Sequence, residues 1–227
     1  MPDATPETPT RRLADIRVEM AKACKIAKRS TEDVALIAVS KTRSADEIRP
    51  LLDAGHRMFG ENRVQEAATK WPDLRISYPD IELHLIGQLQ SNKAEEAVEL
   101  FDCIHSLDRL SLLSALSKAM AKAGKRVPCF IQVNIGEEEQ KGGSAIAELP
   151  ALLDAAKAAN IEVVGLMCIP PADVEAAPYF ALLAELAVRH GLSQLSMGMS
   201  DDFPTAIQLG ATHIRVGTAL FGPRPAG

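Results

Sequence analysis

One lysine follows a short apolar stretch of the chain, a position that suits a nucleophilic amine. Residues 34–39 are continuously apolar, as in a buried strand, and Lys41 comes two residues later. Desolvation at the end of such a strand would favour the neutral amine, which can form an imine. Most lysines, however, are exposed and extend to solvent. The position of Lys41 is therefore compatible with both interpretations.

Two glycine-containing segments near the C-terminus carry hydroxyl groups that could bind a phosphate. They are residues 196–200 and 215–218. Gly198 and Gly217 permit close backbone approach, while Ser200 and Thr218 offer hydroxyl donors at the starts of short helical turns. Ordinary helix capping by serine and threonine is the alternative. Taken together, the two segments predict a cup of amide and hydroxyl donors around a phosphate.

An arginine and a histidine lie within predicted strands and need partners there. Arg215 falls in the apolar stretch 213–216, and its guanidinium requires a buried partner because it does not deprotonate. A salt bridge to a carboxylate at a strand end, such as Glu61, would satisfy it. His84 could face a ligand or be a hydrogen-bonded histidine of the interior.

These residues lie in or next to eight short apolar stretches that alternate with helical segments. The stretches are 34–39, 57–60, 82–86, 103–105, 129–135, 162–167, 194–197 and 213–216. Neighbouring parallel strands need crossover connections, so the alternation predicts a parallel sheet. Eight such units in a chain of 227 residues fit a closed (β/α)₈ TIM barrel, with an open doubly wound sheet as the alternative.

The chain reads as one domain with an extra helix at its start. Residues 1–10, rich in proline and threonine, are predicted to form a flexible tail, and residues 11–227 the barrel domain. Apolar residues at helical spacing from Leu13 to Ala27 predict an amphipathic helix before the first strand. Ser44 and Glu47 form a capping-box pattern for the helix that follows the first strand.

Composition excludes several classes of protein. With 25 basic and 30 acidic residues interspersed, the chain has no electrostatic footprint for nucleic acid or for an anionic membrane. It has no apolar run near the roughly 20 residues that span a bilayer and no secretory signal, so we expect a cytoplasmic protein. Cysteines and histidines show no metal-ligand spacing, which predicts four buried, reduced thiols and no metal site.

Five motifs, in order, resemble the pyridoxal phosphate (PLP) homeostasis protein family. They are VALIAVSKTRS around Lys41, FGENRVQEA around Asn62, HLIGQLQSNK from His84, GLMCIPP from Gly165 and LSMGMSDDFPTAIQLGATHIRVGTALFG from Leu195. The resemblance covers nearly the whole chain from about residue 12. It implies a barrel similar to the N-terminal domain of bacterial alanine racemase, the fold of type III PLP enzymes, with PLP as the cofactor.

The resemblance also implies a role for each site residue. Lys41 would hold PLP as a Schiff base, and Arg215 would face the pyridine nitrogen. The remaining residues divide between phosphate and ring: Ser200, Gly217 and Thr218 would bind the phosphate, and Asn62 and His84 would line the ring pocket.

The family resemblance implies PLP binding, storage or delivery rather than catalysis, with PLP-dependent apo-enzymes as candidate recipients. A racemase needs acid/base groups on both faces of its substrate, and Lys41 can supply only one. Tyr78 and Tyr179, the two tyrosines, fall away from strand ends, and no second domain is expected after residue 222. A racemase-like enzyme, a Schiff-base aldolase and an interaction module using the N-terminal helix are the alternatives. We expect a monomer.

Overall fold

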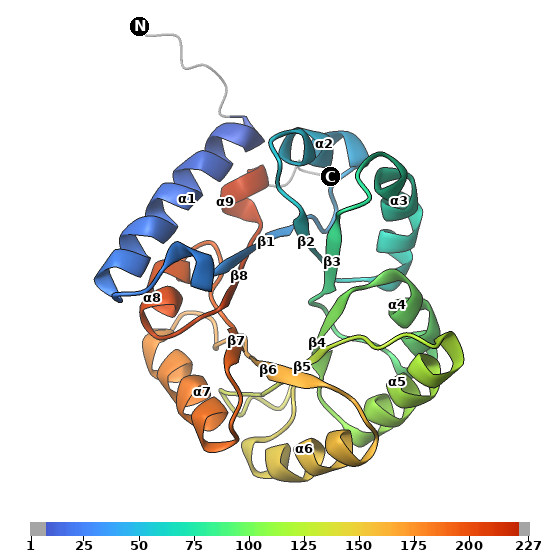
Figure 1. The fold of residues 1–227 in the computed structure, drawn as a ribbon. Coiled ribbons are helices and arrows are strands. Elements are labelled where there is room, and N and C mark those ends of the chain that lie inside the picture. The colour runs from blue at the N-terminus through green and yellow to red at the C-terminus, as the bar shows by residue number, and fades with distance from the viewer. Residues whose placement is uncertain (1–7, 223–227) are drawn as a thin grey trace, which may run out of the picture.

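The computed structural model describes residues 8–222 and contains a closed, eight-stranded parallel barrel (Figure 1). The strands follow one another around the barrel in chain order. They are β1 (Ala35–Val39), β2 (Met58–Glu61), β3 (Glu82–Leu85), β4 (Cys103–Leu107), β5 (Cys129–Gln132), β6 (Val163–Met167), β7 (Gln194–Ser196) and β8 (His213–Val216). The (β/α)₈ barrel predicted from the sequence is confirmed, and the open sheet is wrong because β1 pairs with β8.

Helices surround the barrel as the alternation predicts (Figure 1). They are α1 (Pro9–Ile26), α2 (Ala45–Asp53), α3 (Val64–Ser77), α4 (Ala94–Leu100), α5 (Leu110–Ala123), α6 (Leu149–Ala158), α7 (Ala177–Arg189), α8 (Phe203–Gln208) and α9 (Thr218–Phe221). The capping box at the start of α2 is present: the Ser44 side chain accepts from the Glu47 N–H, and the Glu47 carboxylate accepts from the Ser44 N–H. Such reciprocal bonds satisfy backbone donors that a helix start otherwise leaves unpaired.

The first helix begins earlier than expected. Thr8 caps α1, its side chain accepting from the N–H of Arg11, and Pro9 is the first helical residue. Thr8 therefore caps the helix and residues 9–10 belong to it rather than to a flexible tail, while 1–7 lie outside the described residues. The apolar face of α1 is buried against the outside of the barrel, next to α8 and α9 (Figure 1). That face is consequently unavailable as the docking surface considered above.

Strand residues alternate between the barrel interior and the layer under the helices. In β3 and β4, Leu83, Leu85 and Ile104 join the main apolar core, which consists of the outer faces of the strands and the inner faces of the helices. His84, between Leu83 and Leu85, and His105, next to Ile104, are also buried but point the other way. The interior of the barrel is therefore partly polar, and its contents bear on the site described below.

Pairing of the first and last strands closes the barrel. Ile37 is in register with Arg215, and Ala38 with Val216. Continued by one residue, this register brings Val39 beside Gly217: a Cβ built on Gly217 would lie 3.3 Å from that of Val39. The loop after β1 and the turn after β8, almost 180 residues apart in the chain, thus emerge side by side.

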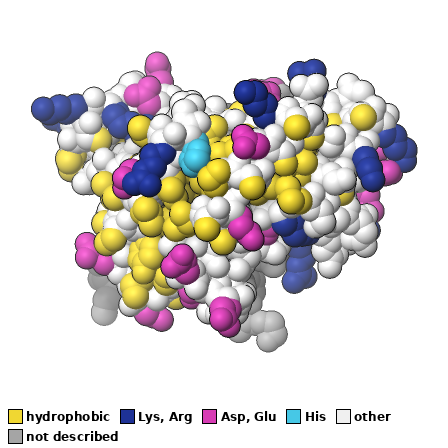
Figure 2. Space-filling model, turned by 90° about the horizontal axis from the view of Figure 1, so that it is seen from below, with side chains coloured by type: hydrophobic (Ala, Val, Ile, Leu, Met, Phe, Trp, Pro, Cys, Tyr) yellow, Lys and Arg dark blue, Asp and Glu magenta, His cyan; other side chains and the backbone are white. Residues whose placement is uncertain are grey.

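The surface carries charges of both signs. On the face shown in Figure 2, acidic and basic side chains are scattered among hydrophobic and neutral ones, in line with their interspersion in the sequence. No helix within residues 8–222 is long and apolar enough to cross a membrane.

Candidate functional site

A cavity of about 250 Å³ lies at the carboxyl-terminal ends of the barrel strands, where (β/α)₈ barrels have their active sites. Its walls come from the loops after β1, β2, β3, β6, β7 and β8. The lining residues are Val39, Lys41, Thr42, Arg43, Asn62, Ile86, Ile169, Met199, Ser200, Asp201, Arg215, Gly217 and Thr218. The site residues expected from the sequence are in this set with two exceptions, His84 and Gly198.

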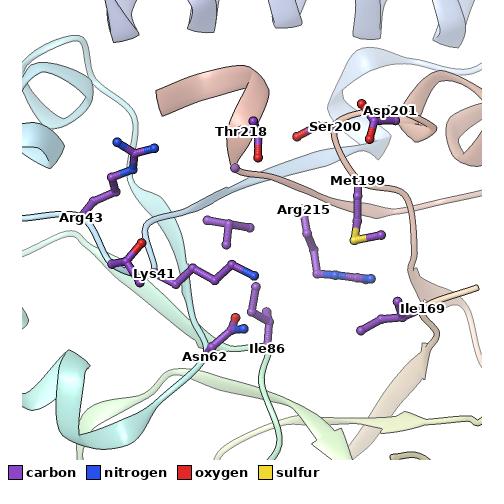
Figure 3. A pocket seen from close by; sticks show the side chains of 13 residues that line it. Lys41, Arg43, Asn62, Ile86, Ile169, Met199, Ser200, Asp201, Arg215 and Thr218 are labelled. Atoms are coloured by element: carbon purple, nitrogen blue, oxygen red, sulfur yellow. The ribbon is translucent and has the colours of Figure 1, made fainter. Parts of the chain in front are cut away.

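Lys41 extends into the cavity, with its terminal nitrogen directed toward Arg215 (Figure 3). The backbone on either side of it is held by Lys70 of α3, whose Nζ donates to the carbonyls of Ser40 (2.9 Å) and Arg43 (3.0 Å). The turn itself closes through a bond from the Arg43 N–H to the Ser40 carbonyl (3.0 Å), with Thr42 in the left-handed region at a φ of 63°. The half-buried Lys41 side chain thus projects from a fixed turn.

A buried carboxylate anchors this turn from below. Glu61 is fully buried and accepts from Lys70 Nζ (2.8 Å), Ser40 Oγ (2.7 Å) and Trp71 Nε1 (3.0 Å). Burial raises the pKa of Glu61, and the neighbouring Lys70 cation opposes that rise. Glu61 therefore forms its salt bridge with Lys70. The salt bridge between Glu61 and Arg215 that was considered from the sequence is not formed, and that interpretation is wrong.

Arg215 forms the floor of the cavity and is held by neutral groups. Its Nη1 donates to Ser196 Oγ (2.8 Å) and its Nη2 to the Cys168 carbonyl (2.9 Å). The side chain is buried, which lowers its pKa, and within residues 8–222 it has no carboxylate at salt-bridge distance. A guanidinium remains charged even there. The cavity thus contains a fixed positive charge whose hydrogen-bond partners, Ser196 and Cys168, are neutral and which Asp202 offsets only without a salt bridge.

The opposite end of the cavity carries hydroxyl groups. Ser200 and Thr218 both line it, and Figure 3 shows them close together beside the start of α9. The Ser200 hydroxyl accepts from the N–H of Ala219 (3.3 Å), which ties the loop after β7 to the turn after β8. Gly198 has a different role from the one expected: a Cβ there would lie 2.5 Å from the Cβ of Ala206, so this glycine permits α8 to pack.

Asn62 borders the cavity near Ile86, facing Lys41 (Figure 3). Its backbone is in close contact with Gly87, where an added Cβ would lie 2.3 Å from the Asn62 carbonyl oxygen. No side chain fits between these two loops, because backbone atoms cannot give way as the end of a flexible side chain can. Gly87 thereby fixes the position of Asn62 at the edge of the pocket.

His84 does not line the cavity, and the expectation that it does is corrected by the structure. It lies in the barrel interior, where its Nε2 is 3.0 Å from Glu82 Oε1 and its Nδ1 is 2.8 Å from Nε2 of His105. Its side chain points toward the amino-terminal end of the strands because Glu82, its partner, is at the start of β3. The alternative of a hydrogen-bonded interior histidine matches this placement.

Some interior and pocket residues could not be recognised from the sequence. His105 and Ser196 contact one another inside the barrel (2.8 Å), and Lys70 reaches the site from a helix. His84, Cys103 and His105 have ligand atoms within 4.8 Å of one another, although their spacing in the sequence shows no metal motif. Contacts between different strands of a barrel leave no local pattern in the sequence. The alternation of side chains along each strand indicates which residues point inward, but not which of them meet. The four cysteines are free and buried, as predicted.

Comparisons with known proteins place nearly the whole chain in one group. The family model described as alanine racemase, N-terminal domain, matches residues 18–225. A pyridoxal phosphate homeostasis protein of Pseudomonas aeruginosa is 41% identical over 223 residues, covering 95% of both chains. One of Escherichia coli K12 is 38% identical over 222 residues, covering 93% of this chain and 95% of that one. The solved structure of PipY from Synechococcus elongatus PCC7942 with PLP bound has a TM-score of 0.82 at 39% identity, covering 95% of this chain and 100% of that one.

The anchor beneath Lys41 yields a stability prediction. Replacing Lys70 by Met leaves Glu61 buried without its counter-charge, which should lower the free energy of unfolding by about 3 to 5 kcal/mol near neutral pH. Because burial raises the pKa of Glu61, protonation removes the uncompensated charge as the pH falls. The deficit should therefore be smaller at about pH 5 than at about pH 8.

Urea unfolding of the wild type and of Lys70→Met at both pH values measures this deficit. The matched control is the double variant Glu61→Gln/Lys70→Met, which has no buried charge at this position and should show little pH dependence relative to wild type. An equal deficit at both pH values in Lys70→Met would contradict the assignment of Glu61 as the group responsible.

Proposed function

The chain belongs to the pyridoxal phosphate homeostasis protein family, and from that membership and the geometry of the cavity we propose that it binds PLP there and takes part in PLP homeostasis. The observation that carries the proposal is the convergence of a lysine amine, a buried guanidinium and a pair of hydroxyls on one cavity. PLP presents an aldehyde, a pyridine ring and a phosphate. Each has a chemically matching group on the walls.

Lys41 would hold the aldehyde end. In its neutral form the amine would form a C=N bond with the aldehyde carbon while the carbonyl oxygen leaves as water, so the cofactor would be held as a Schiff base. The turn clamped by Lys70 restricts the Lys41 backbone, which lowers the entropy lost when the side chain binds. Asn62 would contact the ring from the neighbouring loop, and Ile86 and Met199 supply apolar surface beside it.

Ser200, Thr218 and the backbone at Gly217 would bind the phosphate. Hydroxyl and amide donors in such a turn suit an anion, and the loops after the seventh and eighth strands commonly bind phosphate in (β/α)₈ barrels. Arg215 would then face the pyridine nitrogen; Figure 3 shows its side chain next to the end of Lys41, on the side away from Arg43. When bound, PLP supplies an aldehyde for reversible capture and a ring that can withdraw electrons.

We further propose that the protein stores or delivers PLP and does not turn over amino acids. Amino-acid catalysis by electron withdrawal is favoured by a carboxylate that keeps the pyridine nitrogen protonated, whereas a guanidinium at that position disfavours the protonated ring. The described tyrosines lie elsewhere: the hydroxyl of Tyr78 bonds Asp53, and Tyr179 is on α7. Asp201 does line the cavity, but at the Ser200 end, away from the Lys41 amine (Figure 3).

Lys41 is predicted to be the lysine that captures PLP. The protein should show imine absorbance with PLP, and borohydride reduction followed by peptide mapping should place the adduct on Lys41. Lys41→Ala should lose that absorbance but retain weaker, noncovalent binding through the phosphate contacts. The matched control is Lys93→Ala, a surface lysine paired with Glu96, which should behave as wild type. An adduct on a lysine other than Lys41 would refute the assignment.

The hydroxyl pair is predicted to recognise phosphate. Replacing both Ser200 and Thr218 by Ala should weaken PLP binding by about 1.5 to 3 kcal/mol per lost bond, because hydrogen bonds to charged oxygens are the stronger kind. Binding of pyridoxal, the same aldehyde without phosphate, should change little. Both affinities can be measured by titrating the absorbance at equilibrium. If the double variant weakened the two ligands equally, these hydroxyls would not be phosphate ligands.

Storage and delivery predict transfer without turnover. PLP-loaded protein should restore a PLP-requiring apo-enzyme, and the Lys41→Ala variant should change the time course of that recovery relative to free PLP. Incubation with a panel of amino acids, followed for chirality, keto acid and CO₂, should show no turnover near the roughly 1 s⁻¹ of ordinary enzymes. Turnover at such a rate that disappears in Lys41→Ala would establish the racemase-like alternative instead.

A further inference from the structure

A chain of hydrogen bonds leads from the cavity through the barrel interior to the opposite mouth. Ser196 Oγ is 2.8 Å from Nη1 of Arg215 and 2.8 Å from Nδ1 of His105. On its other side, His105 Nε2 is 2.8 Å from Nδ1 of His84, whose Nε2 is 3.0 Å from Glu82 Oε1. Four strands, β3, β4, β7 and β8, contribute to this chain.

The chemistry of the groups assigns a direction to these bonds. Arg215 can only donate, and the ionised Glu82 can only accept. Glu82 is ionised near neutral pH, because its bond with His84 holds the pKa of the carboxyl below its usual value. We assign these bonds so that each donor has an acceptor: His84 Nε2–H donates to Glu82, His105 Nε2–H to His84, and the Ser196 hydroxyl to His105 Nδ1.

This arrangement leaves the Ser196 oxygen as an acceptor for Arg215. Burial holds the pKa of His105 well below its usual value, so its ring is neutral and one nitrogen is free to accept. Phe130 stacks on the His105 ring with centroids 4.3 Å apart, which fixes the plane of the imidazole. The bonds to Ser196 and the Cys168 carbonyl then determine where the guanidinium lies.

We infer that Ser196 and His105 are positioning residues for the cofactor ring: Ser196 holds the Arg215 guanidinium at the cavity wall, and His105 holds the Ser196 hydroxyl. The inference rests on the proposed function, since it concerns how PLP is held. Neither residue lines the cavity. Both act through Arg215, so their replacement should weaken only that part of binding which depends on the ring nitrogen.

A metal site is the alternative explanation for this cluster, because the ligand atoms of His84, His105 and Cys103 lie within 4.8 Å of one another. Both ring nitrogens of His84 and of His105 already have partners in the hydrogen-bonded chain. Burial also holds the pKa of the Cys103 thiol well above its usual value, which disfavours the thiolate that metals bind. The hydrogen-bonded chain therefore accounts for this cluster better than an ion.

The test compares PLP with 1-deazapyridoxal phosphate, in which a C–H group replaces the ring nitrogen. Ser196→Ala removes the acceptor of Arg215, and His105→Phe removes the partner of Ser196 while keeping an aromatic ring against Phe130. Each should weaken PLP about tenfold, the effect of losing one charge-assisted hydrogen bond. Each should leave the affinity for the deaza analogue within about twofold, since that ligand has no nitrogen for Arg215 to contact.

Two control variants separate positioning from general damage. His105→Asn keeps an acceptor near the Nδ1 position and should retain most of the wild-type preference for PLP. His213→Phe replaces another histidine whose ring lies 6.0 Å from that of His105. Its Nδ1 pairs with Thr212, so His213 is not part of the row of hydrogen bonds from Arg215 to Glu82. This variant should alter neither affinity selectively. Urea unfolding confirms that each variant is folded, and Ser196→Ala decides the test if His105→Phe is not.

Equal weakening of both ligands in Ser196→Ala and His105→Phe, or no weakening of PLP, would overturn the positioning role. Failure of the proposed function looks different, because wild-type protein would then bind neither ligand at Lys41. Wild-type binding that does not distinguish PLP from its deaza analogue would show that Arg215 does not contact the ring nitrogen, which also overturns the inference.

Discussion

The pairing of β1 with β8 is the constraint on which the rest of the site depends. All other pairs join strands that follow one another in the sequence, but this contact joins the first strand to the last. It places the turn carrying Lys41 beside the turn carrying Gly217 and Thr218. Without it, the amine and the hydroxyl pair would be at opposite edges of an open sheet, and no ligand of PLP's size could reach both.

Two buried cations shape the site, and they are stabilised in different ways. Lys70 is paired with the buried Glu61, and its remaining bonds hold the turn around Lys41. Arg215 has instead a hydroxyl and a carbonyl as partners. A buried charge without a salt-bridge partner costs more to bury than a paired one. That cost is reasonable at a position where an acceptor on a ligand would complete the set of bonds, which supports the proposal, implied first by the family resemblance, that the pyridine nitrogen faces Arg215.

Much of this arrangement could be predicted from the sequence because it is encoded locally. Short apolar stretches separated by amphipathic segments predicted all eight strands, and Ser44 with Glu47 predicted the start of α2. The position of Lys41 at a strand end was equally local. The partners of Arg215 were not, since Ser196 lies in β7 and Cys168 directly after β6, and a carboxylate such as Glu61 was the more general choice.

The direction of interior side chains was also beyond the sequence. Alternation shows that His84 points into the barrel, but not whether it lies toward the cavity or toward the opposite mouth. Gly198 likewise looked like part of a phosphate cup, whereas contact with Ala206 explains it. Such assignments depend on distances between elements that come together only in the folded chain.

A crystal structure of the protein after PLP loading and borohydride reduction would test most directly that one ligand joins the two turns brought together by β1 and β8. We expect continuous electron density from Lys41 Nζ through the ring, with the phosphate at Ser200 and Thr218 and the pyridine nitrogen facing Arg215. A ligand attached to Lys41 whose phosphate lies away from both hydroxyls, or whose ring nitrogen faces away from Arg215, would contradict this description of the site.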